Sequence, residues 1–261
     1  MPKDINYQYG NGRLSLYAED SVKDGNGYFT QFIVGGNSTT NSGDRDGPVI
    51  KAWMNNENFV NGGVTEQAPI LLLKLSDSSG INTSGAAIDH DIVATLDNDN
   101  RRYFVLNDYY QGEVNDYKKG SVRFQLPSIE PGNHSLHIKA WDVLNNSGET
   151  RIDFLVAKDE SLQLGHVLNY PNPFINNTSF WFEHNKPGQM LTVTIQIMTI
   201  TGRVIKEIRK QVTTDGNRCT EIEWDGRDEQ GQKLGRGVYL YKLRVSAGSL
   251  SKEVLEKLVI L

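Results

Sequence analysis

Leu191-Thr-Val-Thr-Ile-Gln-Ile197 alternates strictly between apolar and polar side chains. Successive side chains of a β-strand point to opposite faces, so this pattern predicts a strand with its Val and Ile residues turned inward. Thr201-Gly202 follows as a predicted turn, and Val204-Ile-Lys-Glu-Ile208 completes a hairpin. An apolar face opposite a polar one favours an antiparallel sheet that is packed on one side and solvated on the other.

The same period of two recurs along the chain. It is clearest in Ser121-Val-Arg-Phe-Gln-Leu126, in Thr150-Arg-Ile-Asp-Phe-Leu-Val156 and between Gly237 and Val245. Clusters of Gly, Asn, Asp and Ser separate such runs about every ten residues, a spacing typical of β-sandwiches. We therefore predict an all-β protein with two consecutive immunoglobulin-like β-sandwich domains, preceded by a short strand-containing segment.

Three segments follow from these runs. Residues 1–43 hold short strands and a polar stretch from Gly35 to Gly43, and are predicted to be the tail of a preceding β domain or added edge strands. Residues 44–157 hold about seven strand-like runs, enough for one sandwich. Residues 158–261 are predicted to form the second sandwich, which opens with a short linker over residues 158–164.

Charge is distributed unevenly between the two halves. Residues 1–160 hold 14 Lys and Arg against 22 Asp and Glu, a net charge of −8, whereas residues 161–261 hold 13 against 10, a net charge of +3. This change of sign supports a boundary near residue 160. Neither half has a basic run or the aromatic–basic interleaving that nucleic-acid phosphates require, so no nucleic-acid partner is expected.

Composition also bears on the location of the protein. No stretch reaches the ~18 uninterrupted apolar residues of a membrane-spanning helix, so the chain is not expected to span a membrane itself. Residues 1–6 lack the apolar core of a signal peptide. If the protein is exported, we therefore expect this chain to belong to a longer precursor, and a cytoplasmic protein is the alternative. Cys219 is the only cysteine, so no disulfide can form within the chain.

Residues that could carry catalysis do not form a catalytic pattern. A nucleophilic cysteine needs a nearby cation or helix N-terminus and a partner base. Strand alternation predicts Cys219 on the same face as Glu221 and Glu223, whose charges disfavour a thiolate. His134 and His137 lie on a predicted strand, where a spacing of three turns them to opposite faces, so they make no zinc pair. No catalytic residue is assigned, and this segment is not expected to be an enzyme.

Acidic residues in predicted loops are the best candidates for metal ligands, because calcium takes several hard oxygen ligands from such loops. The candidates are Asp44, Asp46, Asp97 and Asp99. None of their segments has the full calcium-loop spacing with a closing Glu, and Asp and Asn also stabilise solvated turns. We expect no bound cofactor, with calcium as the alternative.

Four aromatic residues raise the alternative of a carbohydrate-binding or adhesin-type surface module: Trp53, Tyr109, Tyr110 and Trp141. Such a module would need exposed, coplanar rings. Trp141 ends a strand pattern in which core packing is the favoured interpretation. Tyr109 and Tyr110 follow Asn107-Asp108 and are predicted to lie in a loop.

Four segments of the C-terminal domain carry a family resemblance: Tyr170-Pro-Asn-Pro-Phe174, Trp224-Asp-Gly-Arg-Asp-Glu-Gln-Gly231, Gly235-Arg-Gly-Val-Tyr-Leu-Tyr241 and Lys257-Leu-Val-Ile-Leu261. Together they resemble the C-terminal sorting domains of the type IX secretion system of Bacteroidetes, and more loosely the FlgD-like immunoglobulin module. Such a domain serves in transport and docking. The resemblance therefore implies export and display at the cell surface, associated with the outer membrane.

Upstream segments extend the resemblance: Asp77-Ser-Ser-Gly-Ile-Asn-Thr-Ser-Gly85, Val105-Leu-Asn-Asp-Tyr-Tyr110 and Lys139-Ala-Trp-Asp-Val-Leu-Asn-Asn146. They resemble the C-terminal part of the PorU family, the gingipain-like sortases of the type IX system. In that family the cysteine peptidase domain lies N-terminal to the region matched here, so the resemblance implies a non-catalytic segment. It also implies two kinds of partner, an outer-membrane β-barrel shuttle of the PorV type and the other proteins of the attachment complex.

The last predicted strand, Ser251 to Leu261, is the candidate docking surface. Its apolar residues are Leu255, Leu258, Val259, Ile260 and Leu261. Little sequence follows to cover the edge of this strand, and an uncovered edge is a template for pairing. The alternative is that it is simply the last core strand. The resemblance to the PorU family implies a sorting domain that is kept rather than cleaved. The ending of this chain also departs from the lysine-rich tail of many cleaved sorting domains.

Overall fold

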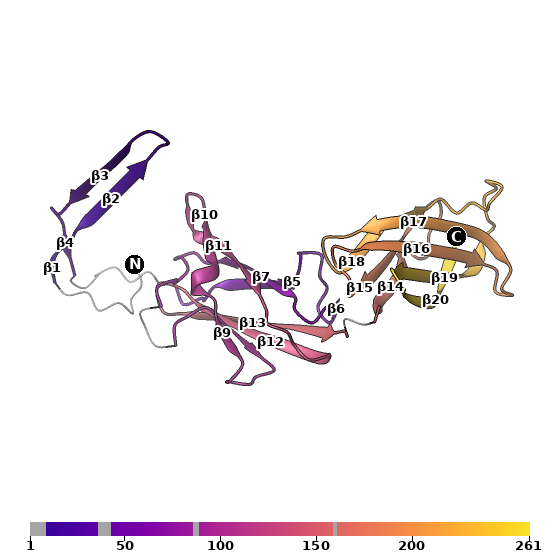
Figure 1. Ribbon diagram of the computed structural model, residues 1–261, viewed down its shortest axis with the longest axis horizontal. Helices are drawn as coiled ribbons and strands as arrows, with labels where there is room; N and C mark the ends of the chain where they lie inside the picture. The colour runs from indigo at the N-terminus through magenta and orange to yellow at the C-terminus, as the bar shows by residue number, and fades with distance from the viewer. Residues whose placement is uncertain (1–8, 36–42, 86–88, 159–160) are drawn as a thin grey trace.

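The computed structural model describes residues 9–35, 43–85, 89–158 and 161–261. Within these residues the regular structure consists of β-strands and one short 3-10 helix, η1 (Asn107–Tyr109). The all-β prediction is therefore confirmed. Figure 1 shows three parts in a row: an N-terminal arm, a central sandwich and a C-terminal sandwich.

The N-terminal arm consists of two small antiparallel pairs. β1 (Gly10–Asn11) pairs with β4 (Ile33–Val34), and β2 (Leu14–Glu19) pairs with β3 (Asp24–Phe29). All residues of β2 and β3 are exposed, and neither pair joins a sheet of the sandwiches in the described part of the chain. The arm therefore does not add edge strands to the central domain. Most of the predicted polar stretch, residues 36–42, lies outside the described residues.

The central domain packs two sheets against each other. One has the order β10 (Tyr110–Glu113), β11 (Asp116–Gln125), β7 (Ile70–Ser76) and β5 (Val49–Met54). The other has the order β6 (Val64–Thr65), β13 (Ser147–Val156), β12 (Gly132–Trp141), β8 (Val93–Leu96) and β9 (Tyr103–Val105). Side chains from both sheets form one continuous apolar core, as expected for a sandwich.

Strand alternation is confirmed for the two runs that predicted it in this domain. Val122 and Leu126 of the first run are buried, and so are Ile152, Phe154 and Val156 of the second. Each run therefore contributes its apolar side to the core between the sheets. This is the packing that a period of two predicts.

Trp141 departs from its prediction. The even-numbered residues at the end of β12 fill the core, so alternation turns Trp141 to the outer face, where it is half-buried. There its ring lies 4.2 Å from the ring of His90 and 4.9 Å from Nζ of Lys139. The expectation that Trp141 packs in the core is therefore wrong.

The C-terminal domain is a second two-sheet sandwich. Its smaller sheet has the order β14 (Leu164–Tyr170), β15 (Thr178–His184) and β18 (Arg218–Trp224). Its larger sheet has the order β17 (Val204–Thr213), β16 (Met190–Met198), β19 (Gly237–Ala247) and β20 (Leu250–Ile260). The hairpin predicted around Thr201-Gly202 is confirmed as β16 and β17, with Val193, Ile195 and Ile197 buried.

A β-bulge in β18 changes which residues face inward. Phe180 pairs with Ile222 but Phe182 pairs with Cys219, so the register shifts by one residue between them. The extra residue reverses the alternation and places Cys219 in the core, while Glu221 and Glu223 stay exposed. The prediction that Cys219 shares a face with these two glutamates is therefore wrong.

The two sandwiches touch through a polar seam. Asn55 Nδ2 donates to Asn217 Oδ1 at 2.5 Å, and Asn217 Nδ2 donates to Glu66 Oε2 at 3.2 Å. Gly63 allows the close approach, because a Cβ there would lie 2.9 Å from Glu183 Oε2 in the other domain.

The linker was predicted over residues 158–164, but Leu162 already packs into the second core; residues 159–160 lie outside the described residues. No helix in the described ranges is long and apolar enough to cross a membrane.

Candidate docking site at the last strand

β20 lies at the edge of the larger sheet and pairs along its whole length with β19. Its side chains alternate between the two faces of the sheet. Leu258 (0% exposed) and Ile260 (4%) are core residues, whereas Leu255 (56%) lies on the outer face. Val259 is half-buried on that outer face, and Leu261 is exposed just beyond the strand. The prediction that all five residues form one docking surface is therefore corrected: Leu258 and Ile260 belong to the core.

The open edge of β20 is partly covered by the Tyr170–Phe174 segment. Asn172 Nδ2 donates to the Lys257 carbonyl oxygen at 3.1 Å, and its Oδ1 accepts from the Val259 amide at 3.0 Å. Phe174 then pairs through its backbone, donating to the Val259 carbonyl and accepting from the Leu261 amide. The expectation that nothing covers this edge is wrong for its C-terminal half.

The N-terminal half of β20 stays open. Alternate residues of an edge strand direct their N–H and C=O groups away from the neighbouring strand. Residues 257, 259 and 261 do so toward the Tyr170–Phe174 segment, so the same alternation directs the groups of Ser251, Glu253 and Leu255 outward. In the described part of the chain no strand is hydrogen-bonded to β20 on that side, although β14 runs close to it. The three residues form a short, unpaired edge.

The Trp224–Gly231 segment, which follows β18, packs against the Tyr170–Phe174 segment. The Phe174 ring is buried and packs edge-on against Trp224, with 5.7 Å between ring centroids. Trp224 Nε1 donates to the Arg227 carbonyl oxygen, and Asp225 Oδ1 accepts from the Arg227 amide. The Tyr170–Phe174 and Trp224–Gly231 motifs therefore meet around the end of β20. Sequence reasoning missed this meeting, because it joins segments that are distant in the chain.

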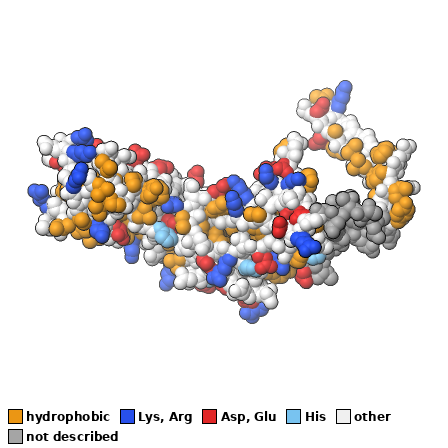
Figure 2. Space-filling model, turned by 180° about the vertical axis from the view of Figure 1, so that it is seen from behind, with side chains coloured by type: hydrophobic (Ala, Val, Ile, Leu, Met, Phe, Trp, Pro, Cys, Tyr) orange, Lys and Arg blue, Asp and Glu red, His pale blue; other side chains and the backbone are white. Residues whose placement is uncertain are grey.

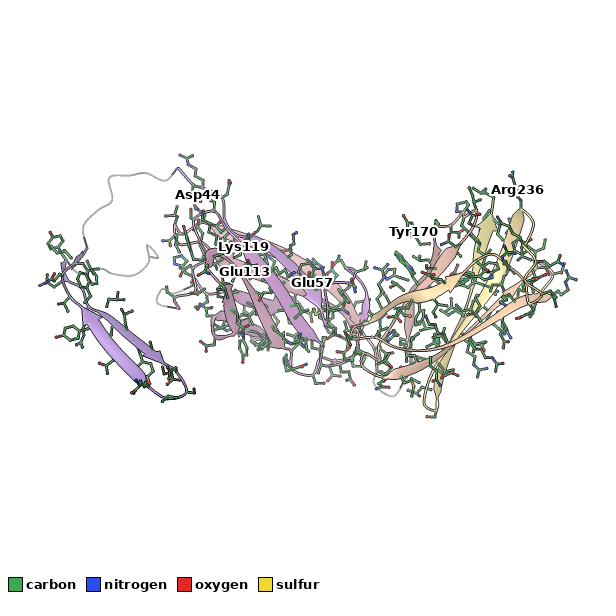
Figure 3. The ribbon with its side chains drawn as sticks, turned by 90° about the horizontal axis from the view of Figure 1, so that it is seen from above. Asp44, Glu57, Glu113, Lys119, Tyr170 and Arg236 are labelled. Atoms are coloured by element: carbon green, nitrogen blue, oxygen red, sulfur yellow. The ribbon has the colours of Figure 1, made fainter. Side chains whose placement is uncertain are left out.

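Asp44 belongs to an acidic cluster in the central domain. Its carboxylate oxygens lie within 4.8 Å of those of Asp77 and Asp142, two residues that were not among the predicted ligands. Hydrogen bonds from Ser79 and Ser78 hold the pKa of Asp44 below its usual value, whereas burial raises the pKa of Asp77. Asp142 is fully buried. Figure 3 shows Asp44 at the end of the central domain next to the N-terminal arm.

The other three calcium candidates do not join this cluster. Asp46 is exposed and donates its amide to Asp44. Asp97 binds His134 Nδ1 at 2.8 Å; although burial opposes it, this bond helps to lower the pKa of Asp97. Asp99 is paired with Arg101, which lowers the pKa of Asp99. Calcium binding by these residues stays a prediction.

The aromatic residues do not share one platform. Trp53 extends from the outer face of β5 toward Lys74, while Trp141 lies on the outer face of the opposite sheet. Tyr109 closes η1 and packs edge-on against Phe124, and Tyr110 begins β10. Rings on opposite sides of a sandwich cannot stack on one sugar. This separation gives the carbohydrate-binding alternative no support.

Burial favours the neutral forms of two core side chains of the C-terminal domain, Cys219 and His184. Burial raises the pKa of the Cys219 thiol, and a protonated thiol is a poor nucleophile. Burial also lowers the pKa of His184 to about 4. His184 Nδ1 accepts the Lys186 amide, so its Nε2–H donates to Thr214 Oγ1 at 2.8 Å. His134 and His137 bind different acidic partners, Asp97 and Glu149, as expected for opposite faces of β12.

Residues 169–260 match a protein family described as the secretion system C-terminal sorting domain. The predicted resemblance to sorting domains of type IX secretion is therefore confirmed for this part of the chain. A domain of this kind places the protein among secreted or cell-surface proteins. No curated protein matches the chain.

Three solved structures are similar over most of the chain. Dimeric latent PorU from Porphyromonas gingivalis is 26% identical, covers 100% of this chain and 25% of its own, and has a TM-score of 0.45. The BSP domain of a biofilm associated protein is 12% identical, covers 77% and 28%, and has a TM-score of 0.30. PorZ, a surface component of the type-IX secretion system of P. gingivalis, is 13% identical, covers 75% and 36%, and has a TM-score of 0.25. The chain thus spans about a quarter of the PorU chain.

Proposed function

We propose that this chain is a non-catalytic C-terminal segment of a surface sortase of the type IX secretion system. Its last domain directs translocation across the outer membrane and then docks to a β-barrel of the PorV type and to the attachment complex. The observation that carries the proposal is the sorting-domain match over residues 169–260. The protein is then held at the cell surface, associated with the outer membrane.

The open half of β20 is the proposed docking edge. It offers outward N–H and C=O groups at Ser251, Glu253 and Leu255, and the exposed Leu255 side chain lies beside them. An extended segment of the partner would add a strand there, because main-chain hydrogen bonds supply affinity without requiring a cleft. The Tyr170–Phe174 segment pairs with the other half of β20 in this manner. Val259 and Leu261 belong to the covered half of the strand.

Capture of outer-membrane proteins by the full chain tests this docking edge. Glu253→Pro removes one outward N–H and should preserve the fold, because proline is tolerated where an edge strand faces solvent. Glu253→Ala removes the same side chain but keeps the N–H, which makes it the matched control. We expect the alanine variant to retain the barrel and the proline variant to lose it. Equal capture by both folded variants would place the docking surface elsewhere on the domain.

The non-catalytic assignment has its own test. The purified chain should not cleave peptides or sorting-domain substrates, because burial keeps the Cys219 thiol protonated within the core. Hydrolysis that disappears in Cys219→Ala would contradict the assignment. Such a result would not bear on the docking edge, which the capture of outer-membrane proteins by the Glu253 variants tests separately.

A further inference from the structure

The outer face of the larger C-terminal sheet is divided into a polar half and an apolar half. Strand register defines the apolar half: Val204 pairs with Met198, Met198 with Leu240, and Val238 with Val259. Leu255 completes it from the outward position beyond Lys257 on β20, where it pairs with Lys242. We call this group the aliphatic face; its members are Met198, Val204, Val238, Leu240, Leu255 and Val259. Val204, Val238 and Leu255 are exposed, and the other three are half-buried.

The same strand register places two lysines beside residues of the aliphatic face. Lys257 pairs with Leu240, and Lys242 pairs with Leu255. Arg236 lies two residues before Val238 and points away from the end of the sheet (Figure 3). None of these three cations has an ion-pair partner among the described residues. The two acids on the neighbouring polar half, Glu207 and Glu253, are by contrast paired with Arg209 and Arg244.

The residue composition of the aliphatic face and its surroundings favours a lipid surface over a protein as the binding partner. Protein interfaces are enriched in aromatic residues and depleted in Lys, whereas the residues that the strand register sets among the aliphatic face are Lys242 and Lys257. Aliphatic side chains surrounded by unpaired Lys and Arg suit a surface that is apolar inside and anionic at its headgroups. The charge of the chain agrees, because residues 161–261 carry a net charge of +3 and residues 1–160 carry −8. An anionic surface would attract the C-terminal domain and repel the rest.

The opposite face of the domain provides a comparison. Figure 2 shows apolar side chains at several places on the surface of the C-terminal domain. On the smaller sheet Leu168 and Tyr170 are exposed, and Arg218 lies over the Trp181 ring at 4.8 Å. Exposed Glu221 and Glu223 lie on the same sheet, which makes that face less attractive to anions. Charge complementarity therefore favours the aliphatic face.

We infer that the aliphatic face of the sorting domain binds an anionic lipid bilayer directly, with Lys242 and Lys257 at the headgroups and Leu255 and Val238 at the acyl boundary. The inference deepens the proposed docking function and rests on it for its biological setting. A domain whose β20 edge grips an outer-membrane barrel has its adjoining face beside the lipid. The binding itself needs no secretion component, so it is measurable with the purified chain.

Vesicle co-sedimentation of the full chain tests this inference. The probes are vesicles of pure phosphatidylcholine and vesicles with about 30% phosphatidylglycerol, at low and high salt. We expect binding to the anionic vesicles, at least about tenfold weaker binding to the neutral ones, and loss of binding as salt screens the lysines. Lys242→Glu/Lys257→Glu should weaken the partition by about tenfold or more, since each surface cation contributes appreciably to attraction.

Matched variants separate the face from overall charge and hydrophobicity. Lys252→Glu/Lys233→Glu makes the same charge change at exposed positions outside the face and should bind almost as well as the unmodified chain. Leu255→Ser should weaken binding, whereas Leu168→Ser on the opposite sheet should not. Circular dichroism and melting establish that each variant is folded.

Three results would overturn the inference. They are no binding to anionic vesicles, equal binding to neutral and anionic vesicles, and an equal loss of vesicle binding in Lys242→Glu/Lys257→Glu and in the control Lys252→Glu/Lys233→Glu. If folded Lys242→Glu/Lys257→Glu keeps vesicle binding but loses barrel capture in detergent, the face contacts protein instead. The converse pattern, lost vesicle binding with retained barrel capture, supports the lipid face and leaves the docking edge intact. Failure of the Glu253→Pro capture test alone would leave the vesicle result standing.

Discussion

Asn172 illustrates how single side chains fix the end of the last strand. Its amide group both donates to the Lys257 carbonyl and accepts from the Val259 amide, so it takes the place of a missing neighbouring strand. The next pairing, through the Phe174 backbone, depends on the chain being held there. The asparagine in the Tyr170–Phe174 motif therefore has a structural role in this fold.

Asn172→Ala should lower the free energy of unfolding by about 1–2 kcal/mol, because two hydrogen bonds are lost. Amide exchange at Val259 and Leu261 should accelerate more than the global loss explains. The matched control is Asn177→Ala, at an exposed asparagine of the same loop, which should change stability by less than about 0.5 kcal/mol. Unchanged exchange at Val259 in Asn172→Ala would show that the clamp does not hold the strand.

His184 gives the stability of the C-terminal domain a defined pH dependence. Burial lowers its folded pKa to about 4, so the unfolded chain, with an ordinary pKa, binds more protons between these values. The stabilisation is fully present above the unfolded pKa and is lost as the pH falls toward the folded one. Between pH 7 and pH 5 we expect a loss of about 2 kcal/mol from this residue.

Urea unfolding at several pH values measures that loss. His184→Gln should flatten the decline between pH 7 and pH 5, even if the variant is less stable throughout. His137→Gln, at a half-buried histidine of the central domain, is the matched control. A slope that persists unchanged in His184→Gln would mean that another group titrates in this window.

Side-chain direction was predictable from the sequence wherever a strand is regular. Val193, Ile195 and Ile197 are buried as alternation requires. Alternation failed at Cys219, because a β-bulge inserts one residue in β18 and nothing in the local sequence marks it. At Trp141 the alternation of β12 gives an outward side chain. The prediction followed the general preference for burying tryptophan instead, and was therefore wrong.

At the scale of elements, β20 combines a core face, an outer face and a half-open edge. The sequence predicted the strand and its apolar character correctly. Grouping its apolar residues on one surface overlooked strand alternation, which turns Leu258 and Ile260 away from Leu255 and Val259. The sequence could not reveal that Asn172 and Phe174 cover half of the edge, because that pairing joins segments far apart in the chain. For the same reason the sequence identified only one of the three members of the acidic cluster, because Asp77 and Asp142 reach Asp44 only through the fold.

Two substitutions in β20 separate its faces. Ile260→Asp buries an unpaired charge and should cost more than about 3 kcal/mol, enough to unfold much of the domain. Leu255→Asp, on the outer face, should cost less than about 1 kcal/mol. Thermal melting distinguishes them. Similar melting temperatures for the two variants would contradict the assignment of Ile260 to the core.

At the scale of the whole molecule, the polar seam joins two domains that each have a complete core. Glu66 accepts hydrogen bonds from both Asn55 and Asn217, so it holds the seam together. Neither partner could be predicted, since the seam depends on how two separately folded sandwiches meet. The change of net charge near residue 160 did indicate that two units were present.

Glu66→Ala should weaken the seam by about 1–2 kcal/mol while leaving both cores intact. Nuclear spin relaxation should then report different tumbling times for the two sandwiches, where the unmodified chain tumbles as one. Glu57→Ala, which removes only a surface ion pair with Lys74, is the matched control. Joint tumbling in Glu66→Ala would mean that other contacts fix the domains.

Surface display of a fused reporter tests the central claim most directly. A periplasm-targeted fluorescent protein carrying residues 158–261 at its C-terminus is expressed in cells with an intact type IX system, and protease is added to the whole cells. The account predicts that the reporter is degraded, because the sorting domain takes it across the outer membrane and holds it there. It should stay protected in cells without the system and when the domain is absent. A fusion that folds but remains protected inside cells with an intact system would contradict the account.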